Sequence, residues 1–135
     1  MEIGGKMNDC IFCKIVKKEL PSKTIYEDEL IKIIMNINPA TNGHLLIISK
    51  EHHKNLLDTS NELITHSLDI VRNNIYPLLK EKLNCEGLTI AQNNDEGQEI
   101  KHYHIHLIPR YPNDGADYKY SSNIEELDSI FTKLQ

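Results

Sequence analysis

The stretch that most constrains the fold is residues 102–110, a largely apolar run that begins with histidines at the alternate positions 102, 104 and 106. Side chains of a β-strand alternate between its two faces, so His102, His104 and His106 are expected on one face and the residues between them on the other. Neighbouring imidazoles would then lie roughly 6.7 Å apart, because a strand rises about 3.3 Å per residue. The sequence therefore predicts a strand that carries a row of imidazoles on one face.

Length and composition indicate one globular domain. A chain of 135 residues can build one hydrophobic core, so we predict a single domain over residues 1–135, with about residues 1–7 as a disordered N-terminal extension. No apolar run approaches the roughly 18 residues of a membrane span, and the net charge of -5 disfavours nucleic acid, so neither partner is expected. Three cysteines, an odd number, and the lack of a signal-peptide pattern favour a cytoplasmic location without disulfides.

Hydrophobic periodicity predicts mostly antiparallel strands with a few helices, an α+β fold. Thr59 and Glu62 could form a capping box at the start of the longest helix, and Pro77 predicts a kink or break near Tyr76. Helices are predicted at residues 11–18, 59–83 and 124–134, and strands at residues 24–26, 30–35, 44–49, 88–92 and 102–110.

Three interpretations of the histidine row compete. The histidines could be solvated or satisfied by hydrogen bonds in a core, which is the usual case for a single histidine. They could bind a metal ion, although three consecutive same-face residues span too far for all of them to reach one ion. They could also act in catalysis, with one imidazole as nucleophile and its neighbours holding charge or passing protons, which suits an unperturbed pKa near 6.5. The regular spacing favours catalysis.

The histidine row and several shorter motifs resemble the histidine triad nucleotide-binding proteins. The resemblance extends over residues 8–110. It is carried by His102–Ile108 and by Asp9–Ile15, Ile25–Asp28, Asn38-Pro39, Gly43–Ile47, Lys50–His52, Gln92–Asn94, Gly97-Gln98 and Pro109–Tyr111. The Cys-x-x-Cys start is most similar to small bacterial-type members near the purine nucleoside phosphoramidase branch. The resemblance implies a five-stranded sheet flanked by helices, and a homodimer whose sheets join edge to edge.

The resemblance also implies a reaction and its catalytic residues. His104, the middle histidine, would attack the α-phosphate of a purine nucleotide conjugate and form a covalent nucleotidyl-histidine, which water would hydrolyse without a catalytic metal. His106 would bind the phosphate and assist the leaving group, His44 would lie beside the triad, and His102 completes it. The expected substrate is of the adenosine 5′-phosphoramidate type. The alternatives are a diadenosine polyphosphate hydrolase, or a nucleotide- or zinc-binding interaction protein with vestigial activity.

A nucleotide site is implied in the same way. Asn36 would hold the ribose hydroxyls, and Asn93 and Gln98 would lie around the phosphate. Glu99 stands where relatives often carry serine or threonine, and a carboxylate pointing inward there would repel a phosphate. The apolar base pocket would consist of residues that could equally be plain core: Ile11, Phe12, Ile15, Leu20, Ile34, Ile37 and Leu46.

The cysteines near the N-terminus carry a separate hypothesis. Taken alone, a Cys-x-x-Cys pair can be a redox pair, half of a zinc site or two ordinary thiols. The resemblance implies one structural zinc per chain, held by Cys10, Cys13, His52 and His102. This donor set would be a closed tetrahedral site of the structural type.

Overall fold

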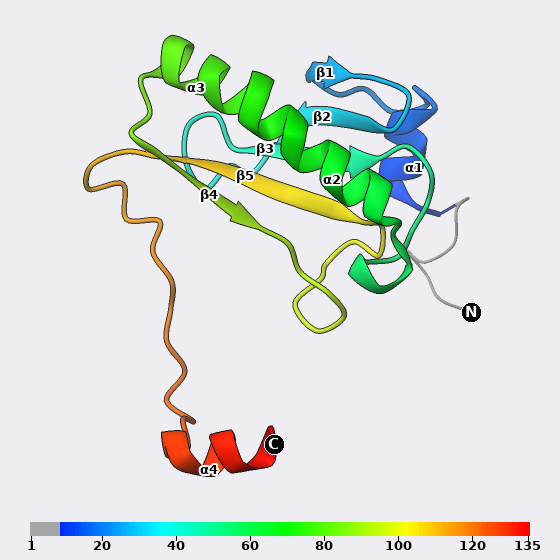
Figure 1. Cartoon of the computed structure of the whole chain (residues 1–135). Coiled ribbons are helices and arrows are strands. Elements are labelled where there is room, and N and C mark those ends of the chain that lie inside the picture. The colour runs from blue at the N-terminus through cyan, green and yellow to red at the C-terminus, as the bar shows by residue number, and fades with distance from the viewer. Residues whose placement is uncertain (1–8) are drawn as a thin grey trace.

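The computed structural model describes residues 9–135, so the predicted N-terminal extension lies outside the described residues. It contains one antiparallel sheet in the order β1-β2-β3-β5-β4 (Figure 1). The strands are β1 Thr24–Glu27, β2 Ile31–Met35, β3 Leu45–Ser49, β4 Gly87–Ala91 and β5 His104–Arg110. The predicted α+β class and five-stranded sheet are therefore confirmed. None of the helices in the described part of the chain is long and apolar enough to cross a bilayer.

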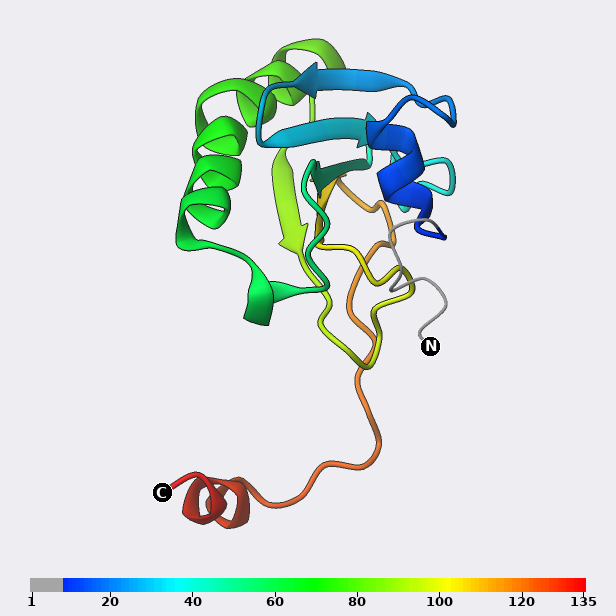
Figure 2. The same cartoon turned by 90° about the vertical axis from the view of Figure 1, so that its right-hand side faces the viewer.

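Helices cover the two faces of the sheet, as the two views show (Figures 1 and 2). A long helical run, formed by α2 Asn61–Ile70, η2 Val71–Ile75 and α3 Tyr76–Leu83, lies on one face, and the short helix α1 Ile11–Val16 lies on the other. Alternate residues of the central strands point to opposite faces of the sheet and belong to two different hydrophobic cores. Ile31, Ile33, Leu45, Ile47, Ile105 and Leu107 pack with the long run, whereas Ile34, Leu46 and Ile48 pack with α1.

The predicted alternation holds in β5, but the prediction that His102 belongs to the strand was wrong. β5 begins at His104. The His102 carbonyl accepts a hydrogen bond from the His104 ring, at 2.7 Å, instead of one from a strand neighbour. The His102 ring turns to the Ser49 carbonyl, 2.7 Å from Nε2, at the end of β3. The ladder therefore stops before His102, and this histidine serves a different site from His104.

The long helical run begins one residue later than the predicted capping box, and the break that was one of the two expectations for Pro77 does not occur. Ser60, not Thr59, is the N-cap, because its hydroxyl accepts the Leu63 N–H at 3.2 Å. Thr59 instead closes the short 3-10 helix η1 Leu56–Asp58. The run does not break at Pro77, because the π-helical turn η2 precedes it and Tyr76 N–H bonds to the Val71 carbonyl. A widened turn accommodates a residue that has no N–H to donate.

The C-terminal helix α4, Leu127–Lys133, forms within the predicted range but buries none of its residues. It stands apart from the sheet at the end of an extended segment (Figures 1 and 2). Leu127 is 84% exposed and Phe131 62% exposed, so its apolar side chains are uncovered in the single chain. At the start of the segment, Arg110 pairs with Asp114 and Asp117, both at 2.9 Å.

The β1–β2 hairpin is fixed to the long helical run through Asp28. Its carboxylate accepts hydrogen bonds from Tyr26 Oη at 2.7 Å, from His66 Nε2 at 2.6 Å and from the backbone N–H groups of Leu30 and Ile31. Burial alone would raise the pKa of Asp28, but these hydrogen bonds outweigh it and lower the pKa to about 2. The ionised carboxylate is therefore part of the folded structure.

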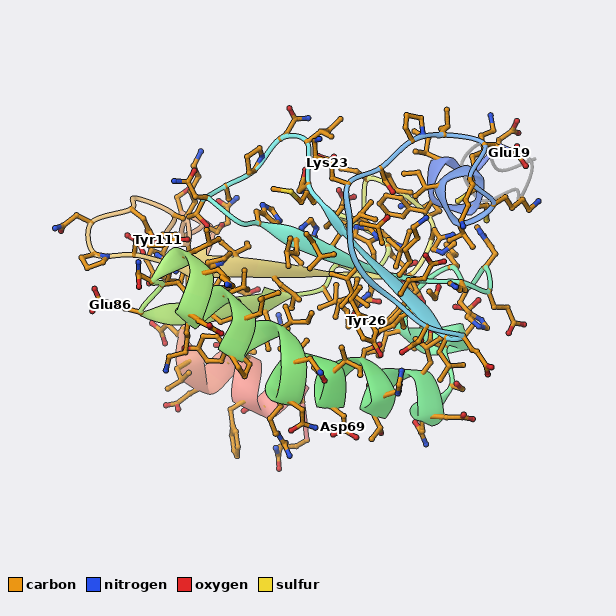
Figure 3. All side chains as sticks on the ribbon, turned by 90° about the horizontal axis from the view of Figure 1, so that it is seen from above. Glu19, Lys23, Tyr26, Asp69, Glu86 and Tyr111 are labelled. Atoms are coloured by element: carbon orange, nitrogen blue, oxygen red, sulfur yellow. The ribbon has the colours of Figure 1, made fainter. Side chains whose placement is uncertain are left out.

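We expect Asp28→Asn to lower the free energy of unfolding at neutral pH by about 2 kcal/mol. This figure converts the difference between the unfolded pKa of 3.8 and the folded pKa of about 2, at about 1.4 kcal/mol per pKa unit. Because the folded pKa is depressed, this stabilisation is present above the unfolded value of 3.8 and disappears as the pH falls through about 2. Urea unfolding of both proteins across this range measures it. Asp69→Asn, at an exposed position on α2 (Figure 3), is the control. Equal losses in the two variants, or a loss that is independent of pH, would contradict the role given to Asp28.

Candidate active site and metal centre

A cavity of about 1300 Å³ lies against the α1 face of the sheet. Its walls come from α1, the segment before β1, the end of β2 and the segment after it, β3, the loop before β5, and β5 itself. All seven apolar positions predicted for the base pocket are in the lining, together with the polar positions Asn36, His44, Asn93, Glu99, His104 and His106. Side chains from distant parts of the sequence therefore meet around one space.

Gln98 is the nucleotide-site prediction that the structure places elsewhere. It is buried, its Nε2 donates to the Lys54 carbonyl at 2.6 Å, and its Oε1 accepts the Asp95 N–H at 3.1 Å. An amide with these backbone partners holds the turn before β5 rather than lining the cavity. Eight further lining residues were not predicted as site residues: Pro21, Ser22, Lys23, Met35, Asn38, Pro39, Gly97 and Ile100. For Ile100 the sequence did offer an indication, because Ile100 lies two residues before His102 and so continues the alternate positions of the histidine row.

His104 is oriented as a nucleophile. It is buried, and its Nδ1 donates to the His102 carbonyl at 2.7 Å, so the other ring nitrogen, Nε2, keeps its lone pair. The Phe12 ring packs edge-on against it with ring centroids 5.0 Å apart. Burial lowers the pKa of His104, opposed by the His102 carbonyl and by the charge of Glu99. The imidazole is therefore neutral at physiological pH.

His44 and His106 form a hydrogen-bonded relay beside His104. The Ala40 N–H donates to His44 Nδ1 at 2.9 Å, so the proton of neutral His44 is on Nε2. That nitrogen lies 2.9 Å from His106 Nδ1, which must accept, and His106 Nε2 is left as an N–H donor. Burial lowers the pKa of His106 to about 4, with smaller effects from His104 and His44. The site thus has a free lone pair on His104 and a neutral donor on His106.

Asn36 is positioned by the turn that follows β2. Its Oδ1 accepts the Asn38 N–H at 2.9 Å, and its Nδ2 lies 3.4 Å from His44 Nε2. The amide therefore lies at the cavity wall beside the His44–His106 relay. An amide at this place can bond a hydroxyl of a bound molecule as donor or acceptor.

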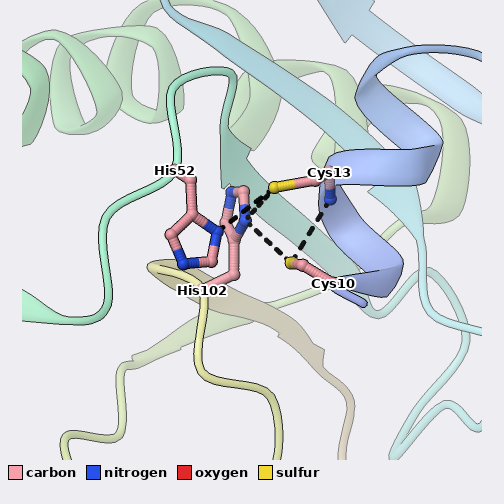
Figure 4. A group of neighbouring side chains, drawn as sticks. All are labelled: Cys10, Cys13, His52 and His102. Atoms are coloured by element: carbon pink, nitrogen blue, oxygen red, sulfur yellow. Dashed lines mark hydrogen bonds between the residues drawn. The ribbon is translucent and has the colours of Figure 1, made fainter. Parts of the chain in front are cut away.

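A second group of side chains meets where α1 begins, next to the cavity (Figure 4). Cys10, Cys13, His52 and His102 each offer one ligand atom, and these atoms all lie within 4.8 Å of one another. Cys10 Sγ is 3.2 Å from His102 Nδ1, and Cys13 Sγ is 3.2 Å from His52 Nδ1. The structure brings together the four residues predicted as metal ligands.

The donor set fits a zinc ion. Zn–S distances of about 2.3 Å and Zn–N distances of about 2.0 Å in a tetrahedron separate neighbouring ligand atoms by about 3.5 Å. Both histidines turn Nδ1 toward the sulfurs, and His102 Nε2 donates to the Ser49 carbonyl, which fixes its tautomer as in many zinc sites. Burial, followed by the neighbouring Cys10, raises the pKa of Cys13 to about 12, so a cation is needed to stabilise its thiolate.

The two sites are joined through one residue. The His102 side chain belongs to the Cys/His group, and its backbone carbonyl holds Nδ1 of His104. The zinc-type site can therefore fix the peptide that orients the nucleophile. Cys85 lies apart, buried in the core under the long helical run.

The comparisons of sequence and of structure with known proteins agree on one family. Residues 17–113 match the HIT domain. An uncharacterized HIT-like protein of Borreliella burgdorferi is 41% identical over 116 residues, which cover 84% of each chain. A crystal structure of a Streptococcus mutans protein is similar with a TM-score of 0.82 at 36% identity, over 99% of this chain and 85% of that one.

Two further relatives bear on the two sites. A zinc-bound histidine triad family protein of Mycobacterium smegmatis has a TM-score of 0.77 at 32% identity, over 87% of this chain and 86% of that one. The adenosine 5′-monophosphoramidase HNT1 of Saccharomyces cerevisiae is 36% identical over 103 residues, 75% of this chain and 62% of the yeast protein. With the domain match spanning most of the sequence and the fold shared with solved members, the chain belongs to the HIT domain family.

Proposed function

We propose that this protein hydrolyses purine nucleotide conjugates of the adenosine 5′-phosphoramidate type at the α-phosphate, through a covalent nucleotidyl-His104. The observation that carries the proposal is the neutral His104, whose Nε2 lone pair is free at a cavity it shares with His106. A pure binding site has no need of a nucleophile oriented in this way. The adenosine 5′-monophosphoramidase among the relatives supports the same reaction.

The proposed reaction has two displacements at phosphorus. In the first, the Nε2 lone pair of His104 forms a bond to phosphorus and the P–N bond of the substrate breaks. The amine leaves with the electron pair and takes a proton from solvent. The His104 ring becomes positively charged, and the His102 carbonyl on its Nδ1–H stabilises this charge. In the second, water adds to phosphorus, its proton returns to solvent, and the P–Nε2 bond breaks to release the nucleotide.

The remaining side chains bind and orient the substrate. The N–H on Nε2 of His106 donates to a phosphate oxygen, and its partner His44 keeps this tautomer in place. Asn36 and Asn93 bond the ribose and the phosphate from the cavity wall. The apolar lining from α1, β2 and β3 encloses a base, and a purine offers it the larger surface.

A zinc ion bound by Cys10, Cys13, His52 and His102 would be structural, because a site with four protein ligands has no open position for substrate. When bound, it would neutralise the two thiolates and tie α1 to the segment before β5. The zinc-bound relative from Mycobacterium smegmatis supports this assignment. The three cysteines, which form no disulfide, agree with a reducing cytoplasmic location, which cell fractionation tests.

A homodimer is part of the proposal. β4 is an edge strand with Ile90 47% exposed, and α4 carries an uncovered apolar surface, so both offer contacts to a second copy. Light scattering on the full chain is expected to give the mass of two 15.6 kDa subunits. The mass of one subunit at micromolar concentration would contradict it.

The experiment that tests the proposed function is hydrolysis of adenosine 5′-phosphoramidate beside diadenosine polyphosphates by the purified full chain. We expect turnover of the phosphoramidate to release AMP and ammonia. Preference for the dinucleotides would favour the diadenosine polyphosphate hydrolase alternative. Nucleotide binding without turnover of either substrate would overturn the enzymatic proposal and leave an interaction protein.

A further inference from the structure

A second, smaller pocket of about 330 Å³ lies beside the cavity, at the C-terminal end of α1. Its walls come from the segment that joins α1 to β1, from β1 and from β2. We call it the Lys32 pocket. The two spaces share Leu20, Pro21 and Ser22, whereas the histidines of the candidate active site line only the larger one. The Lys32 pocket is mostly polar, because five of its seven lining residues are Lys18, Ser22, Thr24, Glu27 and Lys32.

Lys32 brings a buried ammonium group to this pocket. The residue is only 4% exposed, and its Nζ donates to the Ile15 carbonyl at 3.1 Å. An ammonium group has three N–H donors, and this is the one hydrogen bond that Lys32 makes with the residues that the structure describes. A buried charge is costly unless its donors are matched. Two donors of Lys32 are therefore left for a molecule that occupies the pocket.

Other lining residues add further donors. Ser22 Oγ and Thr24 Oγ1 lie 3.1 Å apart, so one hydroxyl donates to the other and the second hydroxyl keeps its hydrogen. Lys18 is exposed, and its ammonium group makes no hydrogen bond or ion pair within residues 9–135. The lining therefore has more donors than acceptors, and a ligand with several acceptor oxygens would match it.

Positive charge also exceeds negative charge at the Lys32 pocket. Within the described part of the chain its lining has one carboxylate, that of Glu27, which lies opposite Lys32 in the β1–β2 register. Glu27 pairs instead with Lys50, at 2.8 Å. The hydrogen bond from Lys50 lowers the pKa of Glu27, and the charges of Lys50, Lys32 and Lys18 lower it further. Three ammonium groups thus lie near one carboxylate, and this balance favours an anion.

We propose that the Lys32 pocket binds a small oxyanion of the phosphate class, at a site separate from the phosphate position beside His104 and His106. The oxygens of such an ion would accept from the two free donors of Lys32, from the Ser22–Thr24 hydroxyl pair and from Lys18. The ion can be free phosphate or the phosphate group of a second nucleotide. The inference does not depend on the reaction proposed above, because no histidine lines this pocket.

Titration of the ¹⁵N-labelled full chain with inorganic phosphate, followed by NMR at constant ionic strength, tests the proposal. We expect saturable shifts of the backbone amides of Lys18, Ser22, Thr24 and Lys32, and no such shifts with chloride. Phosphate shifts confined to residues 93–108 would place the ion in the cavity alone and overturn the proposal. A parallel titration with AMP identifies the source: shifts of the same four amides indicate a nucleotide phosphate, and their absence indicates free phosphate.

Variants of the two lining lysines give the expected magnitudes. Lys32→Met removes the buried ammonium group and is expected to weaken phosphate binding by about tenfold or more, because hydrogen bonds to buried charges are strong. Lys18→Gln is expected to weaken it by only about threefold, since its charge is exposed to solvent. Lys32→Met also loses the hydrogen bond to Ile15, so Lys18→Gln decides the matter if that variant does not fold.

Glu27→Gln separates a charge effect from a loss of structure, because it is expected to change binding in the opposite direction. Removing the one carboxylate of the lining should tighten phosphate binding. Lys17→Gln is the matched control, since Lys17 is exposed and adjacent to Lys18 but lies outside the lining, and it should bind phosphate as the wild type does. Unchanged phosphate binding in both Lys18→Gln and Glu27→Gln would overturn the proposal.

Discussion

Replacing His104 with alanine is expected to reduce hydrolysis of adenosine 5′-phosphoramidate by at least about a thousandfold while AMP binding stays within a few-fold of wild type. The reason is that no neighbouring imidazole can replace it. His44 has a partner on each ring nitrogen, and His106 uses Nδ1 to accept from His44 and carries its proton on Nε2. Among the cavity histidines in the described residues, His104 alone keeps a free lone pair on a ring nitrogen.

Steady-state kinetics and calorimetric titration with AMP measure this prediction. His53→Ala is the control, because His53 lies outside the cavity lining. Its Nε2 faces the carboxylate of the exposed Glu51, 3.8 Å away, rather than the cavity. We expect the control to keep most of the activity. Turnover by the His104 variant within tenfold of wild type would show that another group or water attacks the phosphate directly.

Removal of zinc is the second prediction with a large effect. We expect protein purified without chelators to contain about one zinc per chain, and chelation to lower the free energy of unfolding by about 3 kcal/mol, as for a ligand present at a hundredfold excess over its dissociation constant. The ion would join α1 to the segment after β3 and to the segment before β5, so its loss frees one wall of the cavity. Activity is expected to fall as well, because His102 also holds the nucleophile.

Cys13→Ser is expected to lose zinc and stability together, as measured by elemental analysis and thermal unfolding. Cys85→Ser is the control, because Cys85 is equally buried but belongs to the core under the long helical run. It should lose some stability and keep full zinc content. Zinc-free protein with unchanged stability after chelation would contradict a structural metal centre.

Local periodicity predicted much of the fold from sequence. Alternation in β3 and β5 separates Leu45 and Ile105 on one face from Leu46 and His104 on the other, and the structure has the same division. The cavity positions follow from the family motifs, because the strands that carry them lie side by side in the sheet. A strand pattern thus predicts which residues share a face, and the motifs predict which face carries the site.

The sequence could not predict features that depend on tertiary partners. His102 has the parity of a strand residue, but its ring turns to Ser49 and the cysteines, and this ends the strand. Gln98 is polar and adjacent in sequence to cavity residues, yet its amide donates to the Lys54 carbonyl and does not line the cavity. Pro77 predicts a kink or a break near Tyr76, and only the structure of the whole helical run shows the π-helical turn Val71–Ile75 that accommodates the missing N–H donor. Each outcome depends on a group distant in sequence or on the packing of a whole element.

The most direct test of the account is to trap the covalent intermediate. Wild-type protein mixed with adenosine 5′-phosphoramidate and denatured in alkali within milliseconds is analysed by intact and peptide mass spectrometry. We expect one adenylyl group per active chain, on the peptide that contains His104, and no such adduct in His104→Ala. An active enzyme that never carries the adduct, or carries it on another residue, would contradict nucleotidyl transfer through His104.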